Sequence, residues 1–310
     1  MSNEKDNKGI TSTWWYIQLW KLNKLRKKPQ YYVKNTYKAF SERKNKDKFV
    51  ENDYDIGNGI KLYYWRYDEN NEHNENLGDY LSKIIVDYFK PKNIECGKEK
   101  KNKTLYAIGS ILGFRCQDAV VWGSGLLSEN SSYTQRARFS SLDIRAVRGP
   151  KTRKKLLKLG KKCPEVYGDP AILMPQIYMP GDSEKKYDVS VVLHYKDKDM
   201  FIPDDVNKID IITNDYEKFI DEIVQSKLII SSSLHGIILA EAYGVPAIYL
   251  NKDATSVSFK YEDWYNSTGR YDIVWANSFE QALKVKPMEL PDLKNMQQRL
   301  LDSFPYDLWS

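Results

Sequence analysis

The chain has 310 residues, of which 41% are hydrophobic and 29% are charged, a balance typical of globular proteins. It exceeds the roughly 250–300 residues that one hydrophobic core usually serves, so we expect two domains with a ligand cleft. Three cysteines without disulfide or zinc-ligand spacing, no apolar run of the ~18 residues that a membrane span needs, and no signal peptide predict a cytoplasmic protein.

The first 55 residues form a basic, aromatic extension. They contain 13 Lys/Arg and 7 Asp/Glu, which accounts for the whole net charge of +6. Within it, residues 11–32 combine tryptophans and leucines with a basic cluster, a pattern that an interfacial helix beside anionic lipid would use. A helix packed on the body of the protein is the alternative. The neutral remainder carries no nucleic-acid-binding motif, so we expect no nucleic acid partner.

Residues 56–180 alternate short β-rich runs with amphipathic helices. The apolar runs end in glycine or polar residues, as buried parallel strands do before a loop. In chain order, we expect a strand at 60–67, a helix at 76–89, strands at 104–112, 119–125 and 142–150, and a helix at 149–160. This half is predicted to be one Rossmann-like domain.

A stretch rich in proline, glycine and charge at 175–188 places the second domain at residues 181–310. There we expect strands at 188–195, 209–213, 227–232 and 245–250, helices at 216–226, 235–244 and 290–304, and an aromatic loop at 261–272. Strands that alternate with helices in both halves predict two doubly wound α/β domains.

The segment SSSLHG at residues 231–236 ends a strand and begins a helix. Free backbone N–H groups at a helix N-terminus attract anions, and open α/β sheets bind ligands at the carboxyl ends of their strands. The imidazole of His235 can donate to an anion and transfer a proton near neutral pH. These features predict an anion site formed by Ser232, Ser233, Leu234, His235 and Gly236. A structural histidine in an ordinary strand–turn–helix is the alternative.

Four ordered motifs resemble those of the polysaccharide pyruvyl transferase family. They are NLGDYLS (76–82), VWGSGLL (121–127), IRAVRGPKTRKKL with VYGDPAIL (144–156 and 166–173), and SSSLHGIILAEAYGVPAIYL (231–250). The resemblance covers about residues 60–250 and implies a GT-B-like pair of Rossmann-type domains facing a cleft. Many members have arginine before the Leu-His pair where this chain has Ser233, so we expect an arginine elsewhere to compensate.

The reaction that this resemblance implies transfers pyruvate from phosphoenolpyruvate to two hydroxyls of one sugar, forming a cyclic ketal and releasing phosphate. Neither a cofactor nor a metal is expected. The acceptor that the resemblance implies is a polysaccharide repeat unit, linked to lipid at the inner face of the cell membrane. The chemistry needs an acid for the enol methylene, stabilisation of the cationic C2, and groups that hold phosphate and carboxylate.

Three residues are the candidates for catalysis. His235 is expected as the acid or the phosphate donor, and Arg148 as an anion clamp, because guanidinium binds carboxylate or phosphate bidentately. Asp79 could cap its helix, orient an acceptor hydroxyl, or do both. Asp169 is expected to be a turn residue and Glu241 a structural one.

The remaining candidates are expected to bind substrate. Backbone N–H groups of the central glycine loop could cradle phosphate. The set comprises Gly123, Ser124 and Gly125 of that loop, Asn76 and Gly78 of the first motif, Arg145 behind Arg148, and His194 at the end of a strand of the second domain.

Two other functions compete with this prediction. EAYGVP (241–246) also resembles an element that GT-B nucleotide-sugar glycosyltransferases place against the nucleotide. The Leu-His-Gly and Asn-Leu-Gly-Asp motifs, which that class does not require, favour pyruvyl transfer. A non-catalytic membrane-associated assembly protein is the second alternative, and it predicts that the cleft residues are dispensable.

Overall fold

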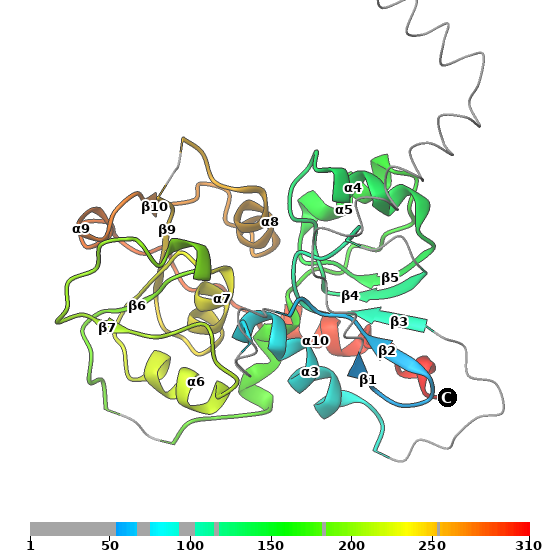
Figure 1. The fold of residues 1–310 in the computed structure, drawn as a ribbon, viewed down its shortest axis with the longest axis horizontal. Helices are drawn as coiled ribbons and strands as arrows, with labels where there is room; N and C mark the ends of the chain where they lie inside the picture. The colour runs from blue at the N-terminus through cyan, green and yellow to red at the C-terminus, as the bar shows by residue number, and fades with distance from the viewer. Residues whose placement is uncertain (1–53, 67–74, 93–102, 115–117, 182–183, 253–254) are drawn as a thin grey trace, which may run out of the picture. The chain divides into compact units, whose positions relative to one another are not determined.

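The computed structural model describes residues 54–66, 75–92, 103–114, 118–181, 184–252 and 255–310 (Figure 1). The predictions for the basic segment 11–32 therefore lie outside the described residues. Two parallel-rich sheets with helices between their strands confirm the α/β class. In the part of the chain that is described, no helix is long and apolar enough to span a bilayer.

The first half contains a sheet in the order β1-β2-β3-β4-β5. Its strands are β1 (Tyr54–Asp55), β2 (Ile60–Leu62), β3 (Lys103–Tyr106), β4 (Ala119–Trp122) and β5 (Leu142–Ala146). β1 is antiparallel to β2, whereas the other neighbours are parallel. Every crossover steps to the same side, so this sheet has a sequential order rather than the doubly wound order predicted for it.

The second half contains a sheet in the order β10-β9-β8-β6-β7, in which all neighbours are parallel. Its strands are β6 (Ser190–Val192), β7 (Asn207–Lys208), β8 (Ile229–Ser231), β9 (Ala247–Leu250) and β10 (Trp275–Ala276). The chain adds β7 on one side of β6 and the later strands on the other, which is the predicted doubly wound order. The reversal between β6 and β8 marks the place where such sheets bind ligands.

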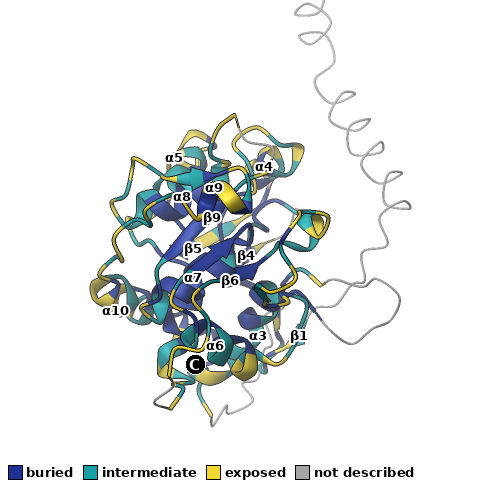
Figure 2. Ribbon diagram, turned by 90° about the vertical axis from the view of Figure 1, so that its left-hand side faces the viewer, coloured by how far each residue is buried: buried dark blue, intermediate teal, exposed yellow. Residues whose placement is uncertain are grey.

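The described residues contain eight α-helices. They are α3 (Leu77–Phe89), α4 (Ser132–Arg136), α5 (Pro150–Lys158), α6 (Tyr216–Val224), α7 (Leu234–Ala242), α8 (Phe259–Ser267), α9 (Phe279–Ala282) and α10 (Lys294–Asp302). Short 3₁₀ helices are η2 (Ala137–Phe139), η3 (Pro170–Gln176), η4 (Tyr195–Asp197) and η5 (Tyr306–Leu308). Figure 2 shows that the central strands of both sheets are buried.

Two predicted elements are wrong. The segment 261–272, predicted as a loop, begins inside helix α8, because Tyr261, Trp264 and Tyr265 lie at helical spacing and are all buried. Residues 209–213 form no strand of the sheet. Instead, the carbonyl of Ile211 accepts the N–H of Leu77 at 2.8 Å, so this segment pairs with the start of α3.

The C-terminal residues pack against the first half. The indole N–H of Trp122 on β4 donates to the carbonyl of Leu300 at 2.8 Å, and that of Trp309 donates to the carbonyl of Ile56 at 3.1 Å. The ring of Phe304 meets Trp122 edge-on, with 4.8 Å between centroids. The largest hydrophobic cluster accordingly contains residues of both halves. Residues 294–309 thus complete the core beneath the first sheet.

Candidate functional site

The turn between β8 and α7 is held by its first serine and its glycine. Ser231 is fully buried; its Oγ accepts the N–H of Ser233 at 3.0 Å and donates to the carbonyl of Val192 at 2.8 Å. A Cβ at Gly236 would lie 2.4 Å from Ser231 Oγ, so this glycine is explained by helix-on-strand packing. Ser233 occupies the N-cap position without a side-chain cap bond. The first N–H groups of α7 therefore lack intrahelical acceptors.

His235, in the first turn of α7, lies directly on the first turn of α3. A Cβ added to Gly78 would stand 1.8 Å from its Nδ1, so only glycine admits the ring here. Asn76 fixes this end of α3, because its Oδ1 accepts the N–H of Gly78 at 3.1 Å. The capping role considered for Asp79 thus belongs to Asn76. The contact brings the first and last sequence motifs together.

Asp169 faces the other side of the same imidazole. Its Oδ1 accepts the N–H of Ala171 at 3.1 Å and so begins η3, as expected of a turn residue. Its Oδ2 lies 3.6 Å from Nε2 of His235. Among the described residues, both atoms are buried without a hydrogen-bond partner. A small movement of either side chain would form an Asp–His hydrogen bond, which would fix the ring's orientation and tautomer.

Asp79 completes this cluster from the first turn of α3. A Cβ at Gly109, after β3, would lie 3.0 Å from its Oδ1, and Gly109 has φ +105°, which favours glycine. Burial raises the pKa of Asp79 to about 6, while the positive charges of His235 and Lys260 act in the opposite direction. A carboxyl with such a pKa can gain or lose a proton close to neutral pH.

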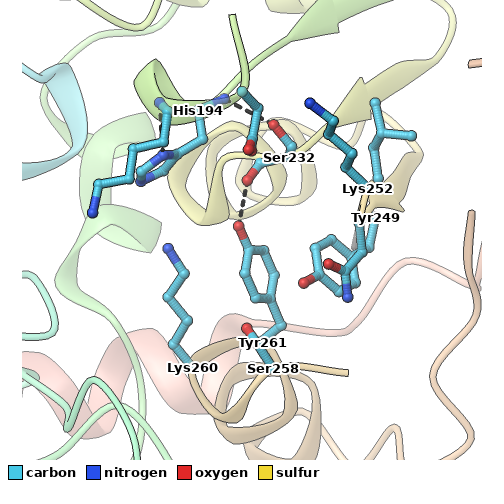
Figure 3. Close-up of a pocket in the computed structure, with 11 residues that line it drawn as sticks. His194, Ser232, Tyr249, Lys252, Ser258, Lys260 and Tyr261 are labelled. Carbon is cyan, nitrogen blue, oxygen red and sulfur yellow. Dashed lines mark hydrogen bonds between the residues drawn. The ribbon is translucent and has the colours of Figure 1, made fainter. Parts of the chain in front are cut away.

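A pocket of about 190 Å³ opens at the carboxyl ends of β6, β8 and β9 (Figure 3). The backbone N–H of His194, after β6, donates to Ser232 Oγ, after β8, at 2.9 Å. The hydroxyl of Tyr261, on α8, donates to the carbonyl of Ser232, and its ring stacks on Tyr249 with centroids 3.9 Å apart. The pocket therefore lies where the strand order reverses.

The pocket carries mainly positive charge. Lys196, Lys252 and Lys260 line it against the single carboxylate of Asp197. Burial, followed by the charge of Arg148, lowers the pKa of Lys260 to about 8, although the charges of Asp79 and Asp197 act in the opposite direction. Burial, together with nearby Lys260 and Lys196, lowers the pKa of His194 to about 3, so this imidazole is neutral.

Arg148 is held by protein groups. Its side chain is 1% exposed and donates from Nε to Asp263 at 3.2 Å, from Nη1 to Ser110 Oγ at 2.7 Å, and from Nη2 to the carbonyl of Leu126 at 2.8 Å. The guanidinium thereby fastens α8 to the segment after β5. Its role as an anion clamp stays a prediction, and it would require these bonds to be exchanged.

The central glycine loop, residues 123–125, packs against Pro170 and the side chain of Arg148. The N–H of Gly123 donates to Ala146 at 2.9 Å and that of Gly125 to Gly109 at 3.0 Å, so both are engaged by backbone carbonyls. A Cβ at Gly125 would lie 2.5 Å from the guanidinium of Arg148. Ser124 is fully buried. Packing accounts for this loop, and its contact with phosphate stays a prediction.

The structure thus gathers six of the sequence candidates into two adjoining groups. His235, Gly78, Asn76 and Asp79 meet in one group, and Ser232 and His194 line the pocket. Charge interactions link Lys260 with Asp79, and His194 with His235.

Leu234 and Arg145 belong to neither group. Leu234 is buried in the core cluster, and Arg145 pairs with Asp143 and Asp307 at the surface.

Sequence reasoning missed Asp169 as a partner of His235, and it missed Lys260 and Tyr261 altogether. Tyr261 fell in the segment 261–272 that was predicted to be a loop, and Lys260 lies directly before it in a stretch for which no element was predicted. The apolar spacing of Tyr261, Trp264 and Tyr265 would have indicated a helix. Asp169 offered no signal beyond its position in a motif. The described ranges contain no cluster of three or more His, Cys, Asp or Glu side chains able to hold a metal ion.

Comparison with known proteins identifies the family to which the sequence is similar. Residues 19–253 match the sequence profile of the family described as polysaccharide pyruvyl transferase. The chain is 28% identical over 210 residues to the uncharacterized protein L143 of Acanthamoeba polyphaga mimivirus, covering 63% of this chain and 71% of that protein. It is 30% identical over 221 residues to the succinoglycan biosynthesis protein ExoV of Rhizobium meliloti (strain 1021), covering 68% of this chain but 65% of ExoV, slightly less than two thirds.

Proposed function

Because this chain belongs to the polysaccharide pyruvyl transferase family, we propose that it transfers pyruvate from phosphoenolpyruvate to a sugar of a polysaccharide repeat unit. Two hydroxyls of one sugar become bonded to C2 of the donor, and the bond between C2 and the phosphate oxygen breaks. One hydroxyl proton ends on the methylene carbon, which becomes a methyl group, and the other ends on phosphate. The products are a cyclic ketal and inorganic phosphate.

The convergence of His235, Asp79 and Asp169 carries this proposal. Three titratable side chains from three separate motifs meet where a Cβ at Gly78 would touch the imidazole. In the proposed mechanism, His235 delivers the proton to the methylene carbon while Asp169 orients its ring. Asp79 accepts the proton of the attacking hydroxyl. The two carboxylates also stabilise the positive charge that develops at C2.

The proposal extends to where the protein works. We place the acceptor, linked to lipid, at the inner face of the cell membrane, with the body of the protein in the cytoplasm. The tryptophans and basic residues of segment 11–32 support attachment to an anionic lipid surface. A GT-B-like arrangement of the two halves is part of the same proposal, supported by the two parallel-rich sheets.

A nucleotide-sugar glycosyltransferase is less well supported by the site. In that class, an acidic residue at the position of Glu241 would grip the ribose hydroxyls. Here Glu241 is 5% exposed; it accepts from Arg270 Nη1 at 2.6 Å and from the indole N–H of Trp264 at 3.0 Å. Since both carboxylate oxygens already have donors, this residue is a structural anchor, as the sequence suggested.

The test supplies ¹³C-labelled phosphoenolpyruvate and lipid-linked oligosaccharides and follows phosphate release together with the ketal methyl signal by NMR. We expect both signals with the native protein, neither with His235→Ala, and both with Tyr271→Ala, which alters an exposed side chain outside the site. Consumption of sugar nucleotides in place of phosphoenolpyruvate, or a full rate with His235→Ala, would overturn the proposal.

A further inference from the structure

We propose that the pocket at the carboxyl ends of β6, β8 and β9 is a phosphate-binding subsite whose principal cation is Lys260 (Figure 3). This inference rests on the proposed function, because the phosphate concerned is that of the donor and, after transfer, the free product. It assigns a binding role to helix α8, for which the sequence motifs give none.

Lys260 is the lysine of this pocket best placed to receive an anion. Figure 3 shows its ammonium directed into the space between His194 and Tyr261. No carboxylate of the described residues lies within 4.0 Å of it, whereas the ammonium of Lys252 pairs with Asp199. An ammonium in a partly buried pocket without a counter-ion gains more from binding an anion than an exposed one does.

The other polar groups of the pocket suit the same ligand. The Nδ1 of neutral His194 accepts the backbone N–H of Lys196 at 3.2 Å, so the proton of the ring lies on Nε2, which can donate to an anion. Ser232 Oγ accepts the N–H of His194, and its own proton is free to be donated. Donors therefore outnumber the single carboxylate of Asp197.

Size distinguishes a small anion from a larger donor. The pocket holds about 190 Å³, below the ~300 Å³ at which pockets for drug-sized ligands begin. A phosphate group fits this space with a three-carbon acid extending out of it, whereas the pocket is too small to enclose a whole nucleoside diphosphate sugar.

The pocket adjoins the groups proposed to move protons. Charge interactions connect Lys260 with Asp79 and His194 with His235. A phosphate held by Lys260 would therefore leave the enolpyruvate part of the donor beside the imidazole and the Asp79 carboxyl. Binding energy gained at the phosphate would fix this orientation.

Lys260 could supply the cation that an arginine at the position of Ser233 would provide. Arg148, which the sequence suggested as an anion clamp, is bonded to Asp263, and this ion pair holds the helix that carries Lys260. The compensating charge is thus a lysine on α8, with the arginine as its support.

The experiment measures inorganic phosphate binding directly, by ³¹P NMR and calorimetry, with the full-length protein and no acceptor. We compare Lys260→Met, Lys260→Arg and, as the matched control, Lys198→Met, an exposed lysine outside the pocket. Loss of a charge-assisted contact should weaken binding by roughly tenfold or more in Lys260→Met. Lys260→Arg should retain most of the affinity, and Lys198→Met should bind like the native protein. Thermal unfolding checks that each variant is folded.

A second arm uses sulfate, whose charge is constant from pH 6 to pH 9. The charged and titratable groups around Lys260 are Arg148, Asp79, Asp197, Lys196 and His194. The pKa of Lys260 is lowered to about 8, whereas the pKa of Asp79 is about 6 and that of His194 about 3. Sulfate affinity should fall as the pH rises through about 8 in the native protein, and it should be weak at every pH in Lys260→Met.

The outcomes separate the two proposals. If the native protein binds no phosphate, or if Lys260→Met binds it as tightly as the native protein, the subsite is wrong, whatever the donor. If Lys260 is needed for phosphate binding but phosphoenolpyruvate is not consumed with any acceptor, the subsite holds and the proposed reaction fails.

Discussion

Replacing Gly78 by alanine should move the imidazole of His235 without removing any functional group. The added carbon would lie 1.8 Å from Nδ1, whereas ordinary contacts begin at 3.4 Å. The ring or the helix must therefore shift by about 1.6 Å, and a displacement of about 1 Å at a catalytic group costs on the order of 10²-fold in rate. We expect kcat for phosphate release to fall by about 100-fold in Gly78→Ala.

Stability serves as the internal control for this variant. Alanine is a better helix former than glycine by roughly 1 kcal/mol, which offsets part of the steric cost, so the protein should remain folded. Gly181→Ala is the matched substitution, because a Cβ there meets nothing within 4 Å. It should leave kcat and the melting temperature unchanged.

A normal kcat in Gly78→Ala would refute the reasoning, because it would show that the position of His235 against α3 has no part in turnover. A fall in kcat with the ring unmoved, as judged by the chemical shifts of its protons, would refute the steric explanation.

Three further predictions follow from charge and burial. Asp79→Asn should lower kcat. Because folding raises the pKa of Asp79 from 3.8 to about 6, the folded native protein loses stability as the pH rises from about 4 to about 6 and this carboxyl must ionise. The variant should therefore melt at a higher temperature than the native protein at pH 8 but not at pH 4. Asp263→Ala leaves Arg148 buried without its counter-ion and should reduce the free energy of unfolding by about 3–5 kcal/mol in urea, against about 0–1 kcal/mol for Asp307→Ala at the exposed pair with Arg145. Serine at Trp14, Trp15 and Trp20 should reduce sedimentation with anionic liposomes and spare turnover on a soluble acceptor; unchanged sedimentation would remove the membrane proposal.

Strong local signals made most elements predictable. The predicted helix at 149–160 is α5, with Pro150 in its first turn, and the predicted strand at 245–250 contains the buried β9. The order of the strands in each sheet was not predictable in the same way, because the residues of a strand do not specify which other strand it pairs with. Residues 209–213 have the apolar composition of a strand, but Ile211 bonds to Leu77 instead.

The site was predictable where a motif coincides with a helix terminus. The meeting of His235 with Gly78 follows from two such termini, and the sequence pointed to both. Arg148 shows the limit: composition suggests an anion clamp, but only the packed structure shows that Asp263, 115 positions later, already binds it. The charge of a side chain can be read from the sequence, whereas whether that charge is already neutralised cannot.

The packing of residues 294–309 beneath the first sheet has a consequence for biosynthesis. The ribosome makes β4 long before it makes Leu300 and Trp309, whose contacts with Trp122 and Ile56 close that core. Apolar surface of the early strands therefore stays exposed until the second half has been translated. We expect nascent chains that stop before residue 294 to bind chaperones and to be degraded, even though they contain every motif of the proposed site.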